Sequence, residues 1–400
     1  MDNKRVVITG VGVIADNAIG KEDFSKAIFE GVSGIKPISL FDTAEFKVKT
    51  AGEIADFKPQ DFLGDKGLRT LDRSTKLAAS ATKLAIDDSA IQINEDNSRS
   101  LGVSLGSTFG SIASISNFDR EALTDGARYV NPGLFPNTVI NSPASQVSIK
   151  FNIKGFNATI SSAFCAGLDA IGYAADQIRL GRAKVVFAGG VEELCAQLFL
   201  GFYKTGCLAG LNGPEISAPF DKRRNGVILG EGACVLVLED LDAALMRKAN
   251  IYAEVLGLGM SFGSGNLGRA ISLALKESGL NAAEIDFVSS CANSTKDLDA
   301  QESKVLKEVF GGNSSKMQIS AVKSMLGECY SASGSLQVAA AIAGIIRQEA
   351  FPTINYEQQD AACDLNYVVN KPKSCKINKE LINASGKSGY NSSLIISKYQ

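Results

Sequence analysis

The side chains that could carry chemistry in this chain are thiols, carboxylates and lysines, because its 400 residues include no histidine. The missing imidazole excludes Ser-His-Asp and Cys-His catalysis, histidine metal sites and a histidine pH switch. Eight cysteines occur, none of them in a C-x-x-C pair. Several stand in apolar or small-residue runs, so buried, reduced thiols are expected rather than disulfides or a metal site. Any chemistry must use the remaining groups or take place on another chain.

Strand-like and helix-like segments alternate along the chain and would position these groups. Strands that are apolar on both faces predict an α/β fold with helices covering a largely parallel sheet. In each half one strand ends in small polar residues ahead of an Ala/Gly-rich helix, at 161–163 and at 324–327. We therefore predict two related α/β halves, 1–245 and 246–400, that share one core. Strands are expected at 5–10, 100–105, 157–162, 183–190, 251–257, 286–290 and 317–321, and helices at 21–30, 75–91, 166–180, 267–278 and 334–348.

Charge and hydropathy exclude several kinds of partner. The chain has 41 basic and 43 acidic side chains, so no global field favours nucleic acid or an anionic membrane. The longest apolar stretch, 338–346, is too short to span a bilayer. The first residues lead straight into an apolar strand, and no signal peptide is expected. A cytoplasmic protein without a membrane span is predicted.

A single G-x-G-x-x-G match at Gly263–Gly268 follows a strand and precedes a helix. One such match is weak support for dinucleotide binding, because glycines also simply form loops. A G-x-x-x-x-G-K-[ST] phosphate loop is absent from the sequence. We expect no cofactor.

Longer motifs in a fixed order are more informative. Pro219-Phe220-Asp221 is followed by Asn225–Ala233, which reads Asn-Gly-Val-Ile-Leu-Gly-Glu-Gly-Ala. The opening strand Arg5–Gly12, the turn Gly189–Glu192 and the terminal loop Asn383–Asn391 complete the set. Together they resemble β-ketoacyl-acyl-carrier-protein synthases, the ketosynthases of the thiolase fold, from end to end. The resemblance implies a thiolase-like fold whose two halves form a five-layered αβαβα core.

The resemblance also implies a chemistry, the decarboxylative Claisen condensation. In the family, a cysteine at a helix N-terminus holds the acyl chain as a thioester. Two histidines assist decarboxylation of a malonyl-carrier substrate and stabilise the enolate. This reaction needs a thiolate favoured by the helix dipole, backbone N–H groups for the oxyanion and neutral imidazole donors.

The nucleophile of that pattern is replaced. The family sequence S-T-A-C-x-x-G-x-x-A-I-G aligns with residues 161–172, so Phe164 occupies the cysteine position and Cys165 follows it. One residue turns a helical side chain by about 100°, which would aim the Cys165 thiol away from the pocket. Phenylalanine has no nucleophilic atom.

Both histidines of the pattern are replaced as well. The first position holds Cys291 and the second holds Glu328, whereas the family lysine is retained as Lys323. Glu328 would be an anion where an enolate must be stabilised, which is the wrong sign. Lys323 and Glu328 lie five residues apart and are expected to form an ion pair. Many relatives carry an acid nine positions after the second histidine, and Gln337 stands there.

The resemblance assigns a further set of residues to the pocket and its gate. Both phenylalanines of the family's terminal loop are gone, and Lys387 replaces the one that gates the acyl pocket, close to Ser385. The segment after Met260 is shorter than in the family, where a longer loop lies beside the substrate entrance. The loop 135–138, which contains Phe135 and Thr138, is expected to point toward a partner subunit.

These features predict a non-catalytic, chain-length-factor-like subunit of a type II polyketide system, of the aryl-polyene or flexirubin type. By resemblance its partners are an active ketosynthase, paired through the strand 157–162, and acyl carrier protein. Phe164 would fill the subunit's own cavity. Two alternatives stay open: an altered thioester enzyme, for acyl transfer or hydrolysis, that uses Cys165 or Cys291, and a homodimeric acyl-binding protein. A Cys291–Glu328 dyad is disfavoured, because a carboxylate raises a thiol pKa.

Overall fold

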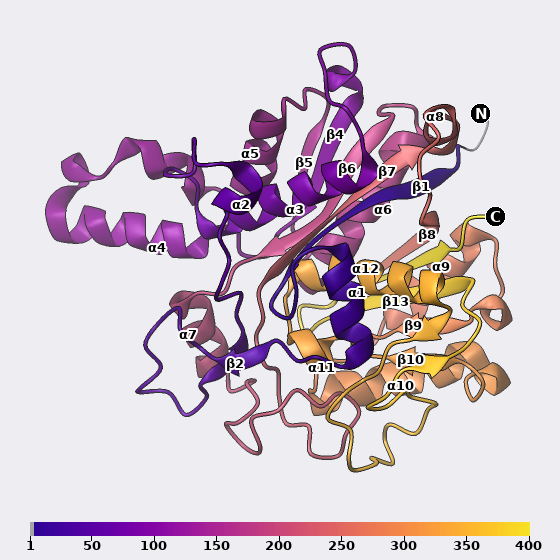
Figure 1. Ribbon diagram of the computed structural model, residues 1–400. Helices are drawn as coiled ribbons and strands as arrows, with labels where there is room; N and C mark the ends of the chain where they lie inside the picture. Colours follow the sequence, from indigo (N-terminus) through magenta and orange to yellow (C-terminus); the bar gives the residue numbers. More distant parts are fainter. Residues whose placement is uncertain (1–3) are drawn as a thin grey trace.

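A computed structural model describes residues 4–400, and its centre is one ten-stranded sheet (Figure 1). The strands of the first half occupy one side of the sheet, and those of the second half the other. The two sides meet where β1 pairs with β8 over residues 6–8. In spatial order the strands are β10 (Gln318–Ser320), β9 (Phe287–Ser289), β13 (Lys379–Ser385), β14 (Tyr390–Ser397), β8 (Ala253–Phe262), β1 (Val6–Ala15), β7 (Gly232–Asp240), β6 (Val185–Glu192), β4 (Leu101–Gly106) and β5 (Asn157–Ile160).

The expectation of a largely parallel sheet is wrong. Five strand pairings are antiparallel, namely β1–β7, β1–β8, β6–β7, β8–β14 and β13–β14. Four are parallel, namely β4–β5, β4–β6, β9–β10 and β9–β13. A strand with apolar residues on both faces is expected to be buried on both faces, but this pattern does not show whether it runs parallel or antiparallel to its neighbours. The sheet is therefore mixed, with helices covering it on both faces.

The five-layered αβαβα arrangement is confirmed by how the helices contact the sheet. On one outer face, α3 (Arg73–Ser89) packs on β1 and β7. On the other, α9 (Leu267–Ser278) packs on β8 and β14 and carries α10 (Lys296–Phe310) outside it. Between the two sides of the sheet lie α6 (Ala166–Arg179) and α12 (Ser331–Arg347), which contact each other and strands of both halves.

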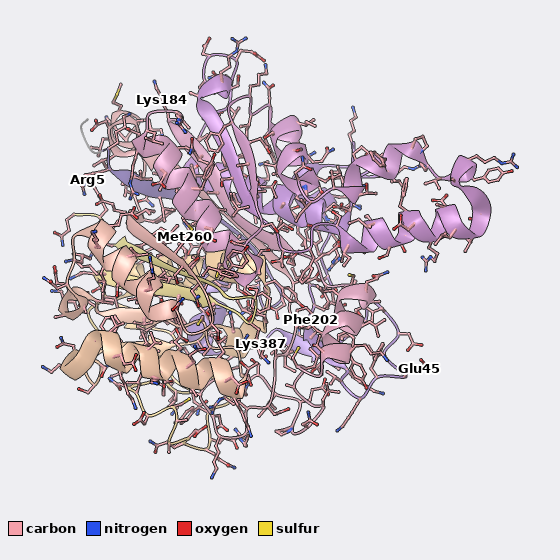
Figure 2. The ribbon with its side chains drawn as sticks, turned by 180° about the vertical axis from the view of Figure 1, so that it is seen from behind. Arg5, Glu45, Lys184, Phe202, Met260 and Lys387 are labelled. Atoms are coloured by element: carbon pink, nitrogen blue, oxygen red, sulfur yellow. The ribbon has the colours of Figure 1, made fainter. Side chains whose placement is uncertain are left out.

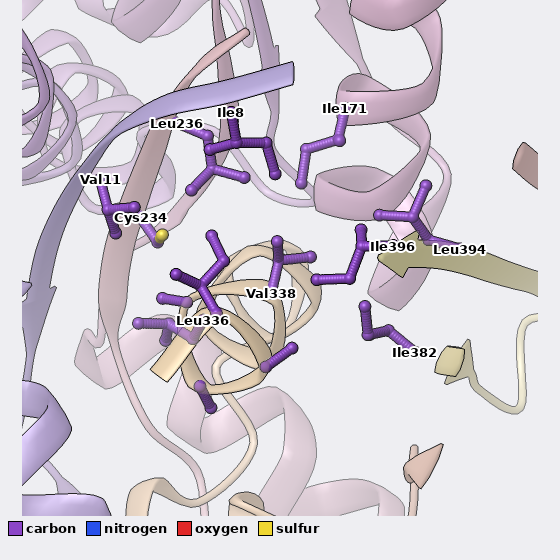
Figure 3. Packing of buried hydrophobic residues seen from close by; sticks show 14 of the residues in the cluster. Ile8, Val11, Ile171, Cys234, Leu236, Leu336, Val338, Ile382, Leu394 and Ile396 are labelled. Carbon is purple, nitrogen blue, oxygen red and sulfur yellow. The ribbon is translucent and has the colours of Figure 1, made fainter. Parts of the chain in front are cut away.

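The central helix α12 is buried along almost its whole length because it is built from small and aliphatic residues. Figure 3 shows Leu336 and Val338 of this helix among the side chains Leu236 and Ile396 of the sheet. Close approach to α6 depends on Gly334, where an added Cβ would stand 2.7 Å from Leu168 Cγ. Although α12 is apolar, neither it nor another helix within residues 4–400 is long and apolar enough to cross a membrane.

Shorter elements connect these layers. The boundary predicted between residues 245 and 246 falls inside one of them, the helix α8 (Leu241–Met246), and it stays a prediction. All eight cysteines are free thiols. The connecting elements are α1 (Lys21–Glu30), β2 (Ile35–Pro37), β3 (Thr50–Gly52), α2 (Gln60–Leu63), α5 (Ser142–Phe151), η5 (Ala163–Cys165), α7 (Ala196–Thr205), α8 (Leu241–Met246), α11 (Lys323–Leu326), β11 (Glu349–Ala350) and β12 (Lys373–Ser374).

One segment, residues 112–141, leaves the body of the molecule, and we refer to it as the arm. Figure 1 shows its helix α4 (Ile112–Glu121) extending to one side. The return path comprises η2 (Ala122–Gly126), η3 (Ala127–Tyr129) and η4 (Pro132–Thr138). Within the arm only Asn137 is buried, while large apolar side chains such as Leu123 and Phe135 are exposed. An ordered helix that buries so little is typical of a surface covered by another subunit.

Candidate functional site

Phe164 lies in η5, the turn between β5 and the central helix α6. The preceding residue, Ala163, has φ of 52°, an unusual conformation for a residue with a side chain, so the turn is tightly constrained. The Phe164 ring lies directly against Gly386 of the terminal loop, where an added Cβ would stand 2.6 Å from Phe164 Cδ2. The position expected for a nucleophile therefore holds a packed aromatic ring.

An aromatic cluster closes around that ring. The ring centroid of Tyr330 lies 5.6 Å from Phe164, 5.4 Å from Phe109 and 5.2 Å from Phe202. Tyr330 is fully buried, and its hydroxyl has no hydrogen-bond partner among residues 4–400. The sequence prediction did not include Tyr330. The available signal was its position as a single aromatic residue between Cys329 and the small-residue run Ser331–Gly334.

Cys165 turns away from this cluster, as the sequence predicted. Its side chain is fully buried, and Sγ donates to Ala384 O at 3.3 Å. Burial, with the nearby Asp169 carboxyl, raises the pKa of the Cys165 thiol to about 12. Although Cys165 stands at the N-cap position of α6, its side chain makes no cap bond, and its thiolate fraction at neutral pH is negligible.

Lys323 and Glu328 form the expected ion pair, with Nζ 2.9 Å from Glu328 Oε2. Both side chains are buried, 3% and 0% exposed. Two side chains that the sequence prediction did not include complete the site: Asn293 Nδ2 donates to the same oxygen at 2.9 Å, and Ser333 Oγ donates to Oε1 at 2.8 Å. Burial works to lower the pKa of Lys323, but the charge and hydrogen bond of Glu328, together with Cys291 and Glu302, outweigh it and the pKa is raised. The ammonium is therefore held as a neutralised cation.

Cys291 borders this pair through its backbone, because its carbonyl oxygen accepts from Lys323 Nζ at 3.2 Å. Its side chain is fully buried. Burial and the charge of Glu302 raise the pKa of the Cys291 thiol well above its ordinary value. Like Cys165, this thiol is a poor nucleophile at neutral pH.

Gln337, on α12, is surrounded by oxygen acceptors. Its Nε2 lies 2.9 Å from Ser290 O, 3.1 Å from Asn383 O and 3.3 Å from Ser289 O. An amide nitrogen has two hydrogens, so these oxygens share them. The neutral amide of Gln337 donates hydrogen bonds here, whereas a carboxylate at this position would face the lone pairs of these carbonyl oxygens.

Lys387 lines a cavity of about 330 Å³ that also touches Cys207, Asn225, Thr295 and Lys296. Figure 2 labels Lys387 together with Phe202 of α7 and Met260 of β8. Lys387 is exposed, whereas Ser385 is buried and donates to Asn391 Oδ1 at 2.7 Å. Ser385 thus shapes the terminal loop, and Lys387 stands at the cavity rim.

Phe135 and Thr138 are not part of this site in the single chain. Both lie in η4 of the arm, where the Phe135 ring packs on Phe118 at 6.1 Å and is 60% exposed. Thr138 Oγ1 donates to Phe135 O at 2.8 Å, which stiffens the turn. If they act on a pocket, that pocket belongs to another subunit.

The arrangement offers little to a reacting substrate. The ring at Phe164 has no nucleophilic atom, the buried thiols are protonated, and the buried Lys323 is paired. Within residues 4–400 no group of three or more cysteines and carboxylates is placed to hold a metal ion. The site thus consists of the cavity beside Lys387 and a packed interior that contains the aromatic cluster and the Lys323–Glu328 pair.

Comparison with known protein families gives two matches that together cover most of the chain. Residues 3–244 match the N-terminal domain of beta-ketoacyl synthases, and residues 257–357 match the C-terminal domain. The chain is 35% identical over 411 residues to 3-oxoacyl-[acyl-carrier-protein] synthase 2 of Coxiella burnetii, covering 100% of this chain and 99% of that protein.

Solved structures with the same fold also align with the whole chain. The ishigamide ketosynthase/chain length factor has a TM-score of 0.91 and 32% identity, and each chain is covered completely. A ketosynthase solved with a type II polyketide synthase acyl-carrier protein, and bound to the hexaketide, has a TM-score of 0.91 and 27% identity, again with both chains fully covered. The thiolase-like ketosynthase fold expected from the motifs is thereby confirmed.

Proposed function

Since this chain belongs to the beta-ketoacyl synthase family, we propose that it is a non-catalytic, chain-length-factor-like partner of an active ketosynthase. The observation that carries the proposal is the sealed site: an aromatic ring at the nucleophile position and a buried Lys323–Glu328 ion pair at a histidine position. The chain keeps the fold of the family, while the side chains that would react with substrate are replaced.

Each replacement removes a step of the family's reaction. Because Phe164 stands at the cysteine position of the family and has no thiol, no acyl thioester can form there. Glu328 presents a negative charge where negative charge would develop on an enolate, and Lys323, which could offset it, is already paired. The aromatic cluster of Phe109, Phe164, Phe202 and Tyr330 occupies space that an acyl chain would need.

The need for a partner is argued from the arm and from β5. The arm exposes apolar side chains along its length, and β5 is the terminal strand of the sheet, with β4 as its one neighbour among residues 4–400. Unpaired edges and apolar patches of this kind are normally covered in an assembly. We propose that both contact the active subunit, and that Phe135 and Thr138 help wall its acyl tunnel.

The relatives support the proposal at different levels. One solved relative is described as a ketosynthase/chain length factor, and another was solved with an acyl-carrier protein. The relative from Coxiella burnetii is named a 3-oxoacyl-[acyl-carrier-protein] synthase, so the family also contains enzymes. We therefore assign catalysis to the partner, delivery of substrate to acyl carrier protein, and tunnel shaping to this chain. An aryl-polyene or flexirubin-type pathway is the proposed setting.

The pairing test is co-purification with the active ketosynthase of the same biosynthetic system. A stable heterodimer is expected, and product chain length should change when Phe135 is replaced by leucine or tryptophan. Ile149→Leu, at an exposed position outside the arm, is the matched control. Unchanged product length in both Phe135 variants would end the role in length control, even if pairing holds.

The alternative of an altered thioester enzyme is tested on the chain alone. Incubation with malonyl- or acyl-carrier protein, followed by intact-mass measurement, should leave the chain unmodified because both candidate thiols are buried and protonated. An acyl adduct lost in Cys165→Ala or Cys291→Ala would establish a catalytic role instead. A long-chain ligand released from the isolated chain by solvent extraction would favour a homodimeric acyl-binding protein.

A further inference from the structure

Two adjacent carboxyls at the end of β6 hold the segment from which the arm departs. Glu192 accepts from the backbone N–H groups of Thr108 at 2.8 Å and Phe109 at 3.0 Å. It also accepts from Ser331 Oγ, at the start of α12, at 2.7 Å. Because Tyr330 directly precedes Ser331, the same carboxylate ties the aromatic cluster to the base of the arm.

Glu193 caps two helices at once. Oε1 accepts from Ala113 N, in the first turn of α4, at 3.1 Å, and Oε2 accepts from Ser74 N, in the first turn of α3, at 3.2 Å. The N-cap residue of α4, Ser111, makes no side-chain cap bond, and within residues 4–400 its buried hydroxyl has no partner. The carboxyl of Glu193 thus replaces the local cap that the arm helix lacks.

We propose that Glu193 is a positioning residue that fixes the arm to the body, with Glu192 as a second tether, and that the proton on Glu193 controls how firmly the arm is held. This inference rests on the proposed function only in giving the arm a role in pairing. Its structural content concerns the single chain, where the bridge between α3 and α4 is already complete.

The surroundings of Glu193 make its charge costly. Its side chain is buried, and Asp72, the N-cap of α3, and Glu192 of β6 add negative charge beside it. The positive charge nearby is Arg73, which is engaged by Glu231 through two hydrogen bonds at 2.7 Å and 2.5 Å. Glu53 and Cys195 are the other titratable groups close by.

Burial and repulsion from Asp72 raise the pKa of Glu193 to about 8, against the opposing effect of the two backbone N–H bonds. When the arm swings away, water reaches the carboxyl and its pKa falls toward its ordinary value, although Asp72 at the N-cap of α3 stays beside it. The attached arm therefore binds this proton more tightly than the detached arm. Detachment becomes easier as the pH rises toward 8, by up to about tenfold per pH unit, and levels off above that value.

Hydrogen exchange of the full chain between pH 6 and 8 tests this directly. After correction for intrinsic exchange, protection of the α4 amides should fall by up to about tenfold per pH unit, while protection of β1 stays level. Glu193→Gln cannot ionise and should give α4 protection without this slope. Glu380→Gln removes a buried carboxyl on β13 that also has a raised pKa, and it should keep the slope.

A wild-type α4 whose corrected protection does not change with pH would overturn the inference, as would an equal slope in Glu193→Gln. If the glutamine variant does not fold, Glu193→Asp serves instead, since its shorter side chain cannot reach both helices and should lower α4 protection at every pH. The outcomes separate from those of the proposed function. A pH-dependent arm on a chain that captures no ketosynthase would leave the anchor standing and refute the pairing.

Discussion

Replacing Glu328 by glutamine is the sharpest perturbation of the sealed site. The change keeps the side-chain shape and removes one charge, so Lys323 is left as a buried ammonium whose acceptors, Cys291 O and the glutamine amide oxygen, are both neutral. One of the two amide hydrogens would also face Asn293 Nδ2 or Ser333 Oγ, which now donate to the carboxylate. The variant thus removes the charge of the pair and weakens the hydrogen bonds around it.

The expected loss is large because both partners are almost completely buried. Removing one member of a buried ion pair typically costs about 3–5 kcal/mol, since the other charge is left uncompensated. With an unfolding entropy of about 2.1 cal/mol/K per residue, a chain of 400 residues should lose roughly 4–6 °C in Tm. The matched control is Asp87→Asn, which breaks the exposed Lys83–Asp87 pair and should cost less than about 1 kcal/mol.

The pH dependence of the loss gives an independent check. In the wild type the pKa of Lys323 is raised, so the stabilisation is complete below its ordinary value of 10.5 and is lost above the folded-state pKa. In Glu328→Gln burial dominates and lowers that pKa, so the variant should gain stability as the pH rises from 7 to 10. Thermal and urea unfolding of the two variants measure both effects. A loss no greater than that of Asp87→Asn, or a difference independent of pH, would refute the reasoning.

Three further outcomes are expected. Phe164→Ala should open a cavity beside Tyr330 and lower the free energy of unfolding by about 1–3 kcal/mol, because the ring is only partly buried. The variant should therefore bind a fluorescent fatty acid more tightly than the wild type does, and equal binding would contradict this. Gln337→Glu should be tolerated better at pH 5 than at pH 8, since a carboxyl facing three backbone oxygens has a raised pKa and destabilises the fold when it ionises; equal unfolding midpoints at both pH values would count against this. Mass spectrometry after iodoacetamide treatment at pH 7 should find Cys207 and Cys375 modified first, because the other cysteines are buried, whereas early labelling of Cys165 or Cys291 would show a reactive thiol.

The sequence predicted the elements better than the direction of the strands. The helices Lys21–Glu30 and Leu267–Ser278 begin and end where their apolar spacing indicated. Strand direction depends on which segments meet in three dimensions, and β1 pairs with strands that lie far from it in the chain. Apolar runs alone could not indicate those pairings.

Spacing in the sequence was enough to predict the ion pair, because Lys323 lies in the short helix α11 and Glu328 lies in the loop directly after it. It was not enough for Asn293 and Ser333, which reach Glu328 from separate elements. The arm was predicted only in part. The loop 135–138 was expected to point toward a partner, but the helix α4 was not predicted, although its apolar residues Ile112, Ile115 and Phe118 recur at helical spacing. None of the residues of α4 is buried, so this pattern does not mark a face packed on the body.

The terminal position of β5 bears on how the protein must be produced. An edge strand with free N–H and C=O groups is a template for strand addition by any other chain. Molecules made in excess of whatever normally occupies that edge would be prone to self-association and precipitation. If the proposed active ketosynthase covers β5, coupled expression of the two chains should give more soluble material than expression of this chain alone.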